Sequence, residues 1–300
     1  MRNPPIDIGA DRERGSVTIL VLWGVAILFV LLAATGFTTR TEILVARNAV
    51  AAMRVREAAD GGTQLGLARL LARRAAGTVI FDGHSENWQD GPVTVAIAIE
   101  DEAGKIDLNQ APLELLAGLF EAVGRPEADA LLLACRIALR RGSPAPSCPQ
   151  PDDADRAPVH PALFTAPEEL AGLPGMNDRL YHAVADSITV ATGAAAIDPE
   201  VAPRTVLLAL PGATPDMVDA YLAARRTQRE MAPEDSDFET LPGYPYLVVS
   251  PDRDFTVSAV ATAPDGARFR ADLQIRLTGQ PSRPYEVMAW RTPPLRPARR

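Results

Sequence analysis

An uncharged apolar segment near the N-terminus constrains this chain more than any other feature. Residues 15–39 contain no Asp, Glu, Lys or Arg, and residues 17–34 are mostly aliphatic. Extended to Phe37, the stretch has about the 20 residues that a membrane-spanning helix needs. Three arginines precede it and none lies within it, which predicts that the N-terminus faces the cytoplasm.

Three kinds of N-terminal segment fit this pattern. A cleaved secretory signal would have a shorter apolar core, of roughly 7–15 residues, with residues 33–36 as its small-residue cleavage site. An uncleaved signal anchor fits the length. A type IV prepilin leader is a short basic segment that ends in Gly and is cut before the apolar run, and Gly15 followed by Ser16 fits that description. This segment alone leaves all three open.

The next residues predict that the apolar helix continues. Ile43, Ala46, Val50 and Met53 recur at helical spacing on one face. No Pro, which would break a helix, occurs in residues 16–77. The sequence therefore predicts one long helix with an apolar first half, which would act as a tethering stalk or as a spine that packs in a filament.

Composition narrows the function classes. The 300 residues are 47% hydrophobic, which excludes a wholly disordered chain, and a net charge of −8 does not favour non-specific binding to nucleic acid. Three His and two Cys are a thin supply of catalytic and soft metal-binding groups. A zinc enzyme or a His-based hydrolase is not expected, and we predict no catalytic residues.

Beyond the helix, the pattern changes from β to α and back. Residues 78–81 and 93–99 have β character, the latter with alternation, while residues 82–91 are rich in turn formers. Helices are expected after Asn109 as a cap and at 127–140, 166–173, 178–187, 203–209 and 215–226. Residues 143–160 are Pro-rich and predicted to be disordered. Residues 254–262 and 267–278 alternate around a Pro-Asp-Gly turn and predict an antiparallel hairpin, with a further strand at 285–290.

Three stretches carry a resemblance to a known family. They are residues 12–23, the phrases at 46–49 and 56–61, and Asp101-Glu-Ala-Gly-Lys-Ile-Asp-Leu-Asn-Gln-Ala-Pro112. Together they resemble the K-type minor pseudopilins of type II secretion systems. Most pilin-like subunits have Glu as the fifth residue after the cleavage site, whereas the fifth residue here is Leu20. That departure distinguishes the K-type subunits.

The resemblance implies an α+β, pilin-like fold in which a long transmembrane and spine helix packs on an antiparallel sheet and a large all-α domain is inserted. The expected division is a leader at 1–15, the helix at 16–76, the first part of the β domain at 77–100, the inserted domain at 101–245, the remaining sheet at 246–292 and a frayed tail at 293–300. Cleavage would fall between Gly15 and Ser16, and Leu20 and Trp23 would pack against other subunits in the membrane.

The implied function is non-enzymatic. The protein would cap the periplasmic pseudopilus at its tip, anchored in the bacterial inner membrane, and support the export of folded proteins. Its implied partners are other minor pseudopilins, the prepilin peptidase, and possible contacts with the outer-membrane secretin channel and secreted substrates. No nucleic-acid partner is expected.

A repeated phrase supports an alternative from another class. Segments that begin at Ala111, Ala166 and Ala202 align, and two of them end in Leu-Pro-Gly. Such repeats resemble helix-hairpin-helix modules, whose hairpin amides can bind a DNA phosphate. A membrane-anchored DNA-uptake protein is therefore the alternative. Asp178 and Asp216 oppose it, because they place acids where a phosphate would lie.

Two further groups of residues are candidates for binding or bridging. The resemblance implies calcium, and Glu234, Asp235, Asp237 and Glu239 form an oxygen-rich loop of the kind that hard cations use, with Asp252 and Asp254 as second choice and a solvated acidic loop as the alternative. Cys135 and Cys148 are the only cysteines. We expect a disulfide in the implied periplasmic setting, with two free thiols as the alternative.

Overall fold

The computed structural model describes residues 13–77, 81–143, 146–148, 161–231, 241–242, 245–249 and 253–293, and among these it leaves out the side chains of 13–16, 32–41 and 228–231. By contact the chain divides into two compact units, Met1–Val55 and Arg56–Arg300. Each unit is described by itself.

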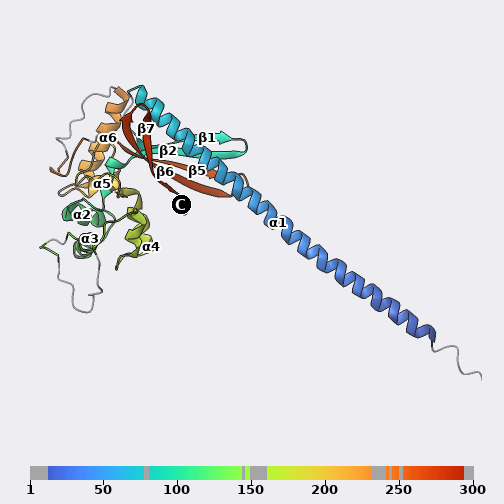
Figure 1. Ribbon diagram of the computed structural model, residues 1–300. Helices are drawn as coiled ribbons and strands as arrows, with labels where there is room; N and C mark the ends of the chain where they lie inside the picture. The colour runs from blue at the N-terminus through green and yellow to red at the C-terminus, as the bar shows by residue number, and fades with distance from the viewer. Residues whose placement is uncertain are drawn as a thin grey trace, which may run out of the picture. The chain divides into compact units, whose positions relative to one another are not determined.

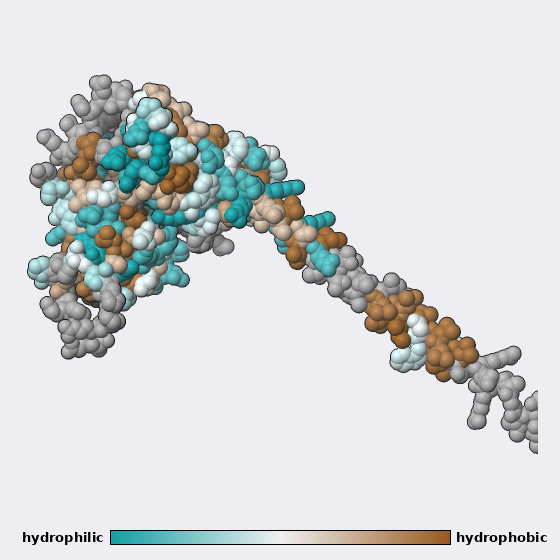
Figure 2. All heavy atoms as spheres, viewed as in Figure 1, coloured by the Kyte–Doolittle hydropathy of each residue, from teal (hydrophilic) through white to brown (hydrophobic). Residues whose placement is uncertain are grey.

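The first unit contains the N-terminal part of helix α1. This helix runs from Glu13 to Ala75, so the predicted long helix is confirmed. Its large apolar side chains between Val17 and Leu31 are exposed, from 46% at Val25 to 70% at Phe29. Hydrophobic surface gathers along this part of the helix (Figure 2). Within the described part of the chain, no helix meets the combined length and apolarity that crossing a bilayer requires.

The second unit is built on an antiparallel sheet. Its strands are β1 (Asp82–Asp90), β2 (Val93–Asp101), β5 (Asp254–Thr262), β6 (Arg268–Gln280) and β7 (Arg283–Arg291), in the order β1-β2-β5-β6-β7. Alternation on β2 and β5 buries every second residue, as a sheet with one covered face requires. The C-terminal part of α1 lies along that face (Figure 1).

Two glycines bring α1 close to the sheet. A Cβ atom on Gly62 would lie 2.7 Å from Cγ1 of Val95, and one on Gly66 would lie 2.4 Å from Cγ1 of Val257. Both distances are shorter than real side chains tolerate. The helix is therefore centred over β2 and β5, and its arrangement on a five-stranded antiparallel sheet is α+β and pilin-like.

The described residues between β2 and β5 are mainly helical. They form η1 (Glu102–Gly104), β3 (Ile106–Asp107), α2 (Leu113–Ala122), α3 (Glu127–Arg140), η3 (Pro167–Gly172), α4 (Asp178–Val184), η4 (Ala185–Ser187), β4 (Ile188–Thr189), α5 (Arg204–Leu208) and α6 (Pro215–Met231). Helices α2 to α6 lie together beside the sheet (Figure 1). One hydrophobic cluster unites them, with Leu115, Phe120, Ile137 and Val206 fully buried.

Several predicted elements differ from the observed ones. The turn-rich residues 82–91 form strand β1, because pairing with β2 satisfies their backbone groups even though their side chains are polar. Strands β3 and β4 pair in parallel inside the region expected to be all-α. Residues 167–172 form a 3-10 helix. The hairpin of β5 and β6 and the helix at 127–140 are confirmed.

Candidate functional site

The most specific motif of the sequence, residues 101–109, lies at the end of β2, where the chain leaves the sheet. The backbone amide of Ala103 donates to Oδ1 of Asp101 at 2.8 Å, which starts the turn of η1. A Cβ atom on Gly104 would lie 2.7 Å from the carbonyl carbon and oxygen of Val201. Glycine is therefore required for the close approach of two backbone segments.

Lys105 is largely buried between two acids, Glu100 near the end of β2 and Glu102 in η1. Its Nζ lies 2.8 Å from Oε2 of Glu100 and 2.7 Å from Oε1 of Glu102. Burial alone would lower the pKa of the ammonium, but the two carboxylates outweigh burial, and the pKa of Lys105 is raised. Because the amine stays protonated, Lys105 itself does not act as a general base.

Asp107 and Asn109 tie the junction to distant loops. Oδ2 of Asp107 accepts from the hydroxyl of Thr192 at 3.0 Å and from the amide of Gly193 at 2.8 Å. The side chain of Asn109 exchanges two hydrogen bonds with the backbone of Phe164, at 3.0 and 2.8 Å. Asn109 was expected to cap α2, but Pro112 occupies that position, so this expectation was wrong.

Through these contacts, each polar residue of the motif holds a turn, an ion pair or a loop in place. Asp101 and Gly104 shape a turn, Lys105 joins two acids, and Asp107 and Asn109 hold loops that are far away in sequence. The motif is therefore a junction that fixes the helical residues to the sheet.

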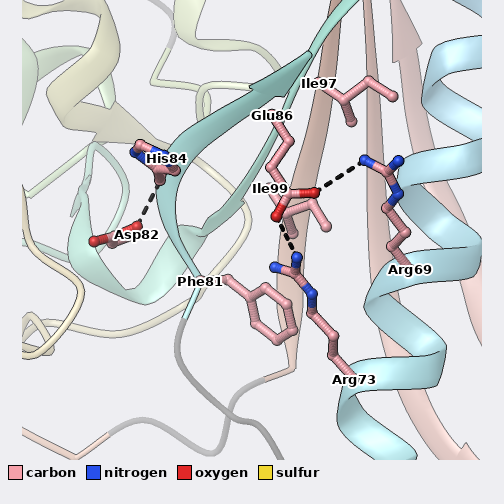
Figure 3. A pocket seen from close by; sticks show the side chains of 8 residues that line it. All are labelled: Arg69, Arg73, Phe81, Asp82, His84, Glu86, Ile97 and Ile99. Atoms are coloured by element: carbon pink, nitrogen blue, oxygen red, sulfur yellow. Dashed lines mark hydrogen bonds and ion pairs between the residues drawn. The ribbon is translucent and has the colours of Figure 1, made fainter. Parts of the chain in front are cut away.

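A small pocket lies between α1 and the edge strand β1 (Figure 3). Arg69 and Arg73 point from α1 toward Glu86 on β1, and Nη1 of Arg69 lies 3.0 Å from its carboxylate. The hydrogen bond from Arg73 is the main cause of a lowered Glu86 pKa. The pocket has a volume of about 70 Å³. Arg69 and Arg73 already pair with Glu86, and these ion pairs join β1 to α1.

The repeated phrases form similar hairpins. Gly175 and Gly212 both have φ of 81°, and the amide after each glycine donates to a leucine carbonyl at 3.0 Å. The helices that follow carry acids in their first turns, among them Asp178 and Asp216. An acid at a helix N-terminus interacts favourably with the helix dipole, and its negative charge would repel a phosphate at the same place. The geometry of the hairpins is shared, but these acids disfavour a DNA-binding use.

The other predicted residues are distributed as follows. Leu20 and Trp23 lie on α1 with 69% and 66% of their surfaces exposed. The backbone of Gly15 and Ser16 is helical, and the side chain of Ser16 lies outside the described part of the structure. Cys135 and Cys148 are joined by a disulfide with a Cα–Cα distance of 5.5 Å.

The acidic loop with Glu234, Asp235, Asp237 and Glu239 lies outside the described residues, as does Asp252. Asp254, the other second-choice ligand, instead accepts from Nε of Arg276 at 2.6 Å. Among the described residues, no group of three or more His, Cys, Asp or Glu side chains is placed to hold a metal ion.

Comparison with solved structures finds a structural likeness. No family model and no curated protein matches the chain. One chain of the crystal structure of the GspK-GspI-GspJ complex from the type 2 secretion system of enterotoxigenic Escherichia coli aligns with a TM-score of 0.56 and 14% identity. The alignment covers 83% of this chain and 99% of that one. The fold is pseudopilin-like. At this identity the likeness concerns the pseudopilin-like fold alone.

Proposed function

We propose that this chain is the K-type minor pseudopilin of a type II secretion system. In this role the protein caps the tip of the periplasmic pseudopilus and supports the export of folded proteins, and it has no enzymatic activity. Residues 101–245 act as the inserted helical domain. The chain is anchored in the inner membrane with its N-terminus in the cytoplasm, and residues 1–15 are a leader that prepilin peptidase removes.

One observation carries this proposal. The pilin-like sheet is interrupted between β2 and β5 by residues 102–253, whose helices share one hydrophobic cluster. In a packed helical filament each subunit has a neighbour above it, which leaves little room for so large a mass. The tip has no such neighbour. A bulky helical region is therefore compatible with the tip and incompatible with the shaft.

Leu20 supports the same position. A carboxylate inside a membrane is costly unless it has a partner, and most pilin-like subunits carry Glu at this place. A subunit without a neighbour above it has no such partner, and leucine avoids the cost.

The proposed function includes a calcium site in the acidic loop. Carboxylate oxygens are the ligands that Ca²⁺ prefers, and residues 234–239 contain four carboxylate side chains within six positions. Calorimetric titration of the full chain with CaCl₂ should show binding that is lost when Asp235 and Asp237 are both changed to Asn. Equal binding by the variant would remove this loop from the proposal.

N-terminal mass spectrometry of the protein extracted from membranes tests the core of the proposal. We expect a mature chain that begins at a methylated Ser16. A chain that begins at Met1 or near Phe37 would instead identify a signal anchor or a secretory signal, and would contradict the assignment.

A Leu20→Glu variant tests the tip position. The variant should not improve secretion, and it should stay at the filament end. A variant that secretes better and appears along the length of the filament would overturn the position.

A further inference from the structure

The face of the sheet that α1 covers extends beyond the helix. Neighbouring strands are about 4.8 Å apart, so β7 lies roughly 10 Å from β5, while a helix with its side chains is about 10 Å wide. Gly62 and Gly66 place α1 over β2 and β5, and a Cβ atom on Gly61 would lie 3.9 Å from the ring of Trp88 on β1. The helix therefore leaves β7 uncovered at the opposite edge.

The uncovered side of β7 is apolar. Trp290 pairs with Leu273 and Val287 pairs with Ile275, and both partners are fully buried on the face that α1 covers. Cross-strand partners share a face, so Trp290 and Val287 also lie on the α1 side. Trp290 is nevertheless 46% exposed and Val287 is 50% exposed. Exposed aromatic and aliphatic side chains in such a row are typical of a contact surface.

This apolar row leads into a groove. The groove has a volume of about 660 Å³ and lies between the end of α1 and the β6–β7 hairpin. Its walls include Leu71 of α1 and Leu277 of β6, and Leu277 pairs with Tyr285 on β7. We call the surface formed by Leu71, Leu277, Tyr285, Val287 and Trp290 the β7 shelf.

Among the residues that the structure describes, the charged side chains that line the groove have one sign. Both charged residues that line the groove are arginines, Arg74 and Arg253. An occupant with carboxylates at the groove would be attracted, whereas one with Lys or Arg would be repelled. The occupant is therefore apolar along its length and acidic at the end that meets the groove.

The outer edge of β7 is poorly suited to pairing with another strand. Pro284 has no backbone N–H to donate, and the register shifts between Gln274 and Ile275, which leaves a bulge at Met288. Proline and bulges are devices that protect sheet edges from strand addition. A helix needs no edge hydrogen bonds. A helix above β6 and β7 would lie about 10 Å from α1, which is the usual spacing of two packed helices.

We propose that the β7 shelf binds an amphipathic α-helix of a neighbouring subunit, with its apolar stripe on Val287 and Trp290 and an acidic end at Arg253. This inference deepens the proposed function, because it specifies the surface by which the chain holds another pilin-like subunit. It does not depend on the tip position.

Site-specific photocrosslinking of the full chain in its own membrane tests the proposal. A benzophenone amino acid replaces Val287 in one variant and Asn87 in the control, which is exposed on the opposite edge strand β1. We expect Val287 to form an adduct whose cross-linked peptide maps to a helix of another pilin-like subunit. An adduct with a second copy of this chain, with a strand or with lipid would overturn the proposal, and so would no adduct.

Substitution gives a second readout. Trp290→Ala and Val287→Lys should each lower the affinity for that subunit about tenfold or more, while Asn87→Lys leaves it unchanged. Thermal unfolding of each variant separates lost binding from lost folding. Arg253→Glu should weaken binding, and Lys in place of the acid on the partner helix should restore it. If Trp290→Ala and Val287→Lys bind like wild type, the shelf is wrong but the proposed function stands. If no position on the chain crosslinks to a pilin-like subunit, the proposed function fails.

Discussion

At the scale of single residues, glycine decides how α1 meets the sheet. Glycine inside a helix costs about 1 kcal/mol of stability relative to alanine. It is therefore favourable only where a neighbouring segment leaves no room for a Cβ atom. At Gly66 the space is missing, because a Cβ atom would lie 2.4 Å from Val257 and 2.9 Å from Ile97. A Cβ atom on Gly61 would lie 3.9 Å from the nearest atoms, in the ring of Trp88, which is an ordinary contact.

These two glycines form a matched pair for substitution. Gly66→Ala should destabilise the protein by about 1–3 kcal/mol through overpacking against β2 and β5. Gly61→Ala should be neutral or stabilising by up to about 1 kcal/mol through its higher helix propensity. Urea unfolding followed by circular dichroism measures both. Equal stabilities for the two variants would contradict the close packing of α1 on the sheet.

The ion pairs of Glu86 give stability a pH dependence. Hydrogen bonding from Arg73 lowers the pKa of Glu86 in the folded state. A lowered carboxylate pKa contributes stability above the ordinary glutamate range, and this contribution is lost as the pH falls through the folded-state value. Glu86→Gln should therefore be less stable than wild type at neutral pH.

The difference between Glu86→Gln and wild type should shrink in acid. Thermal unfolding from pH 7 to pH 3 measures it, and high salt should reduce it at neutral pH, because the pair is partly exposed. A difference that is constant with pH would mean that the carboxylate charge does not join β1 to α1.

At the scale of elements, local pattern was sufficient where strand and turn chemistry agree. The hairpin of β5 and β6 has alternating residues and a turn at Pro264-Asp-Gly266, and its observed register places Ala261 opposite Phe269 as that turn implies. The helix at Glu127–Arg140 was equally clear from its apolar periodicity.

Elements that depend on distant partners could not be predicted this way. Strand β1 has the polar sequence of a loop, and it becomes a strand through pairing with β2 and through Glu86. Strands β3 and β4 are two residues each, and they meet only after the helices between them have packed. The contact of Asn109 with Phe164 joins residues 55 positions apart, which no local cap signal reveals.

The disulfide ties helix α3 to the segment that follows it in the chain. Cys135 is buried on this helix, and the bridge to Cys148 spans 13 positions. Closing a loop of this length stabilises by about 3 kcal/mol in the chain-entropy model. A Cys135→Ser, Cys148→Ser double variant should lose stability of that order, and it should not respond to dithiothreitol, whereas the wild type should.

Thiol titration of the unfolded protein checks the bridge directly. Without reductant we expect no reactive thiol, and after reduction we expect both Cys135 and Cys148 to react. Two thiols before reduction would show that the bridge does not form in the cell, and would weaken the periplasmic location.

At the scale of the whole molecule, the helical residues are inserted between two strands that lie side by side in the sheet. The chain leaves the sheet at Asp101 and returns at Asp254, and Asp101 pairs with Phe255 across β2 and β5. The two ends of the excursion are thus neighbours in the sheet. Contacts such as Arg276 to the carbonyl of Ala191, at 2.6 Å, hold the helical residues against the strands.

Because these ends are adjacent, a two-residue turn can replace the helical residues. In a variant with Asn-Gly in place of residues 102–254, Asp101 and Phe255 flank a hairpin turn of the usual kind. We expect α1 and the five strands to fold, since their buried face depends on pairs such as Ile97 with Ala259. Stability should fall by roughly 1–3 kcal/mol, because the variant loses the ion pairs of Asp254 with Arg276 and of Lys105 with Glu100. Hydrogen exchange decides the outcome: protected amides on β2, β5 and β6 would establish the helical residues as an insertion into a self-sufficient pilin-like unit. An unprotected chain would mean that sheet and helices fold only together.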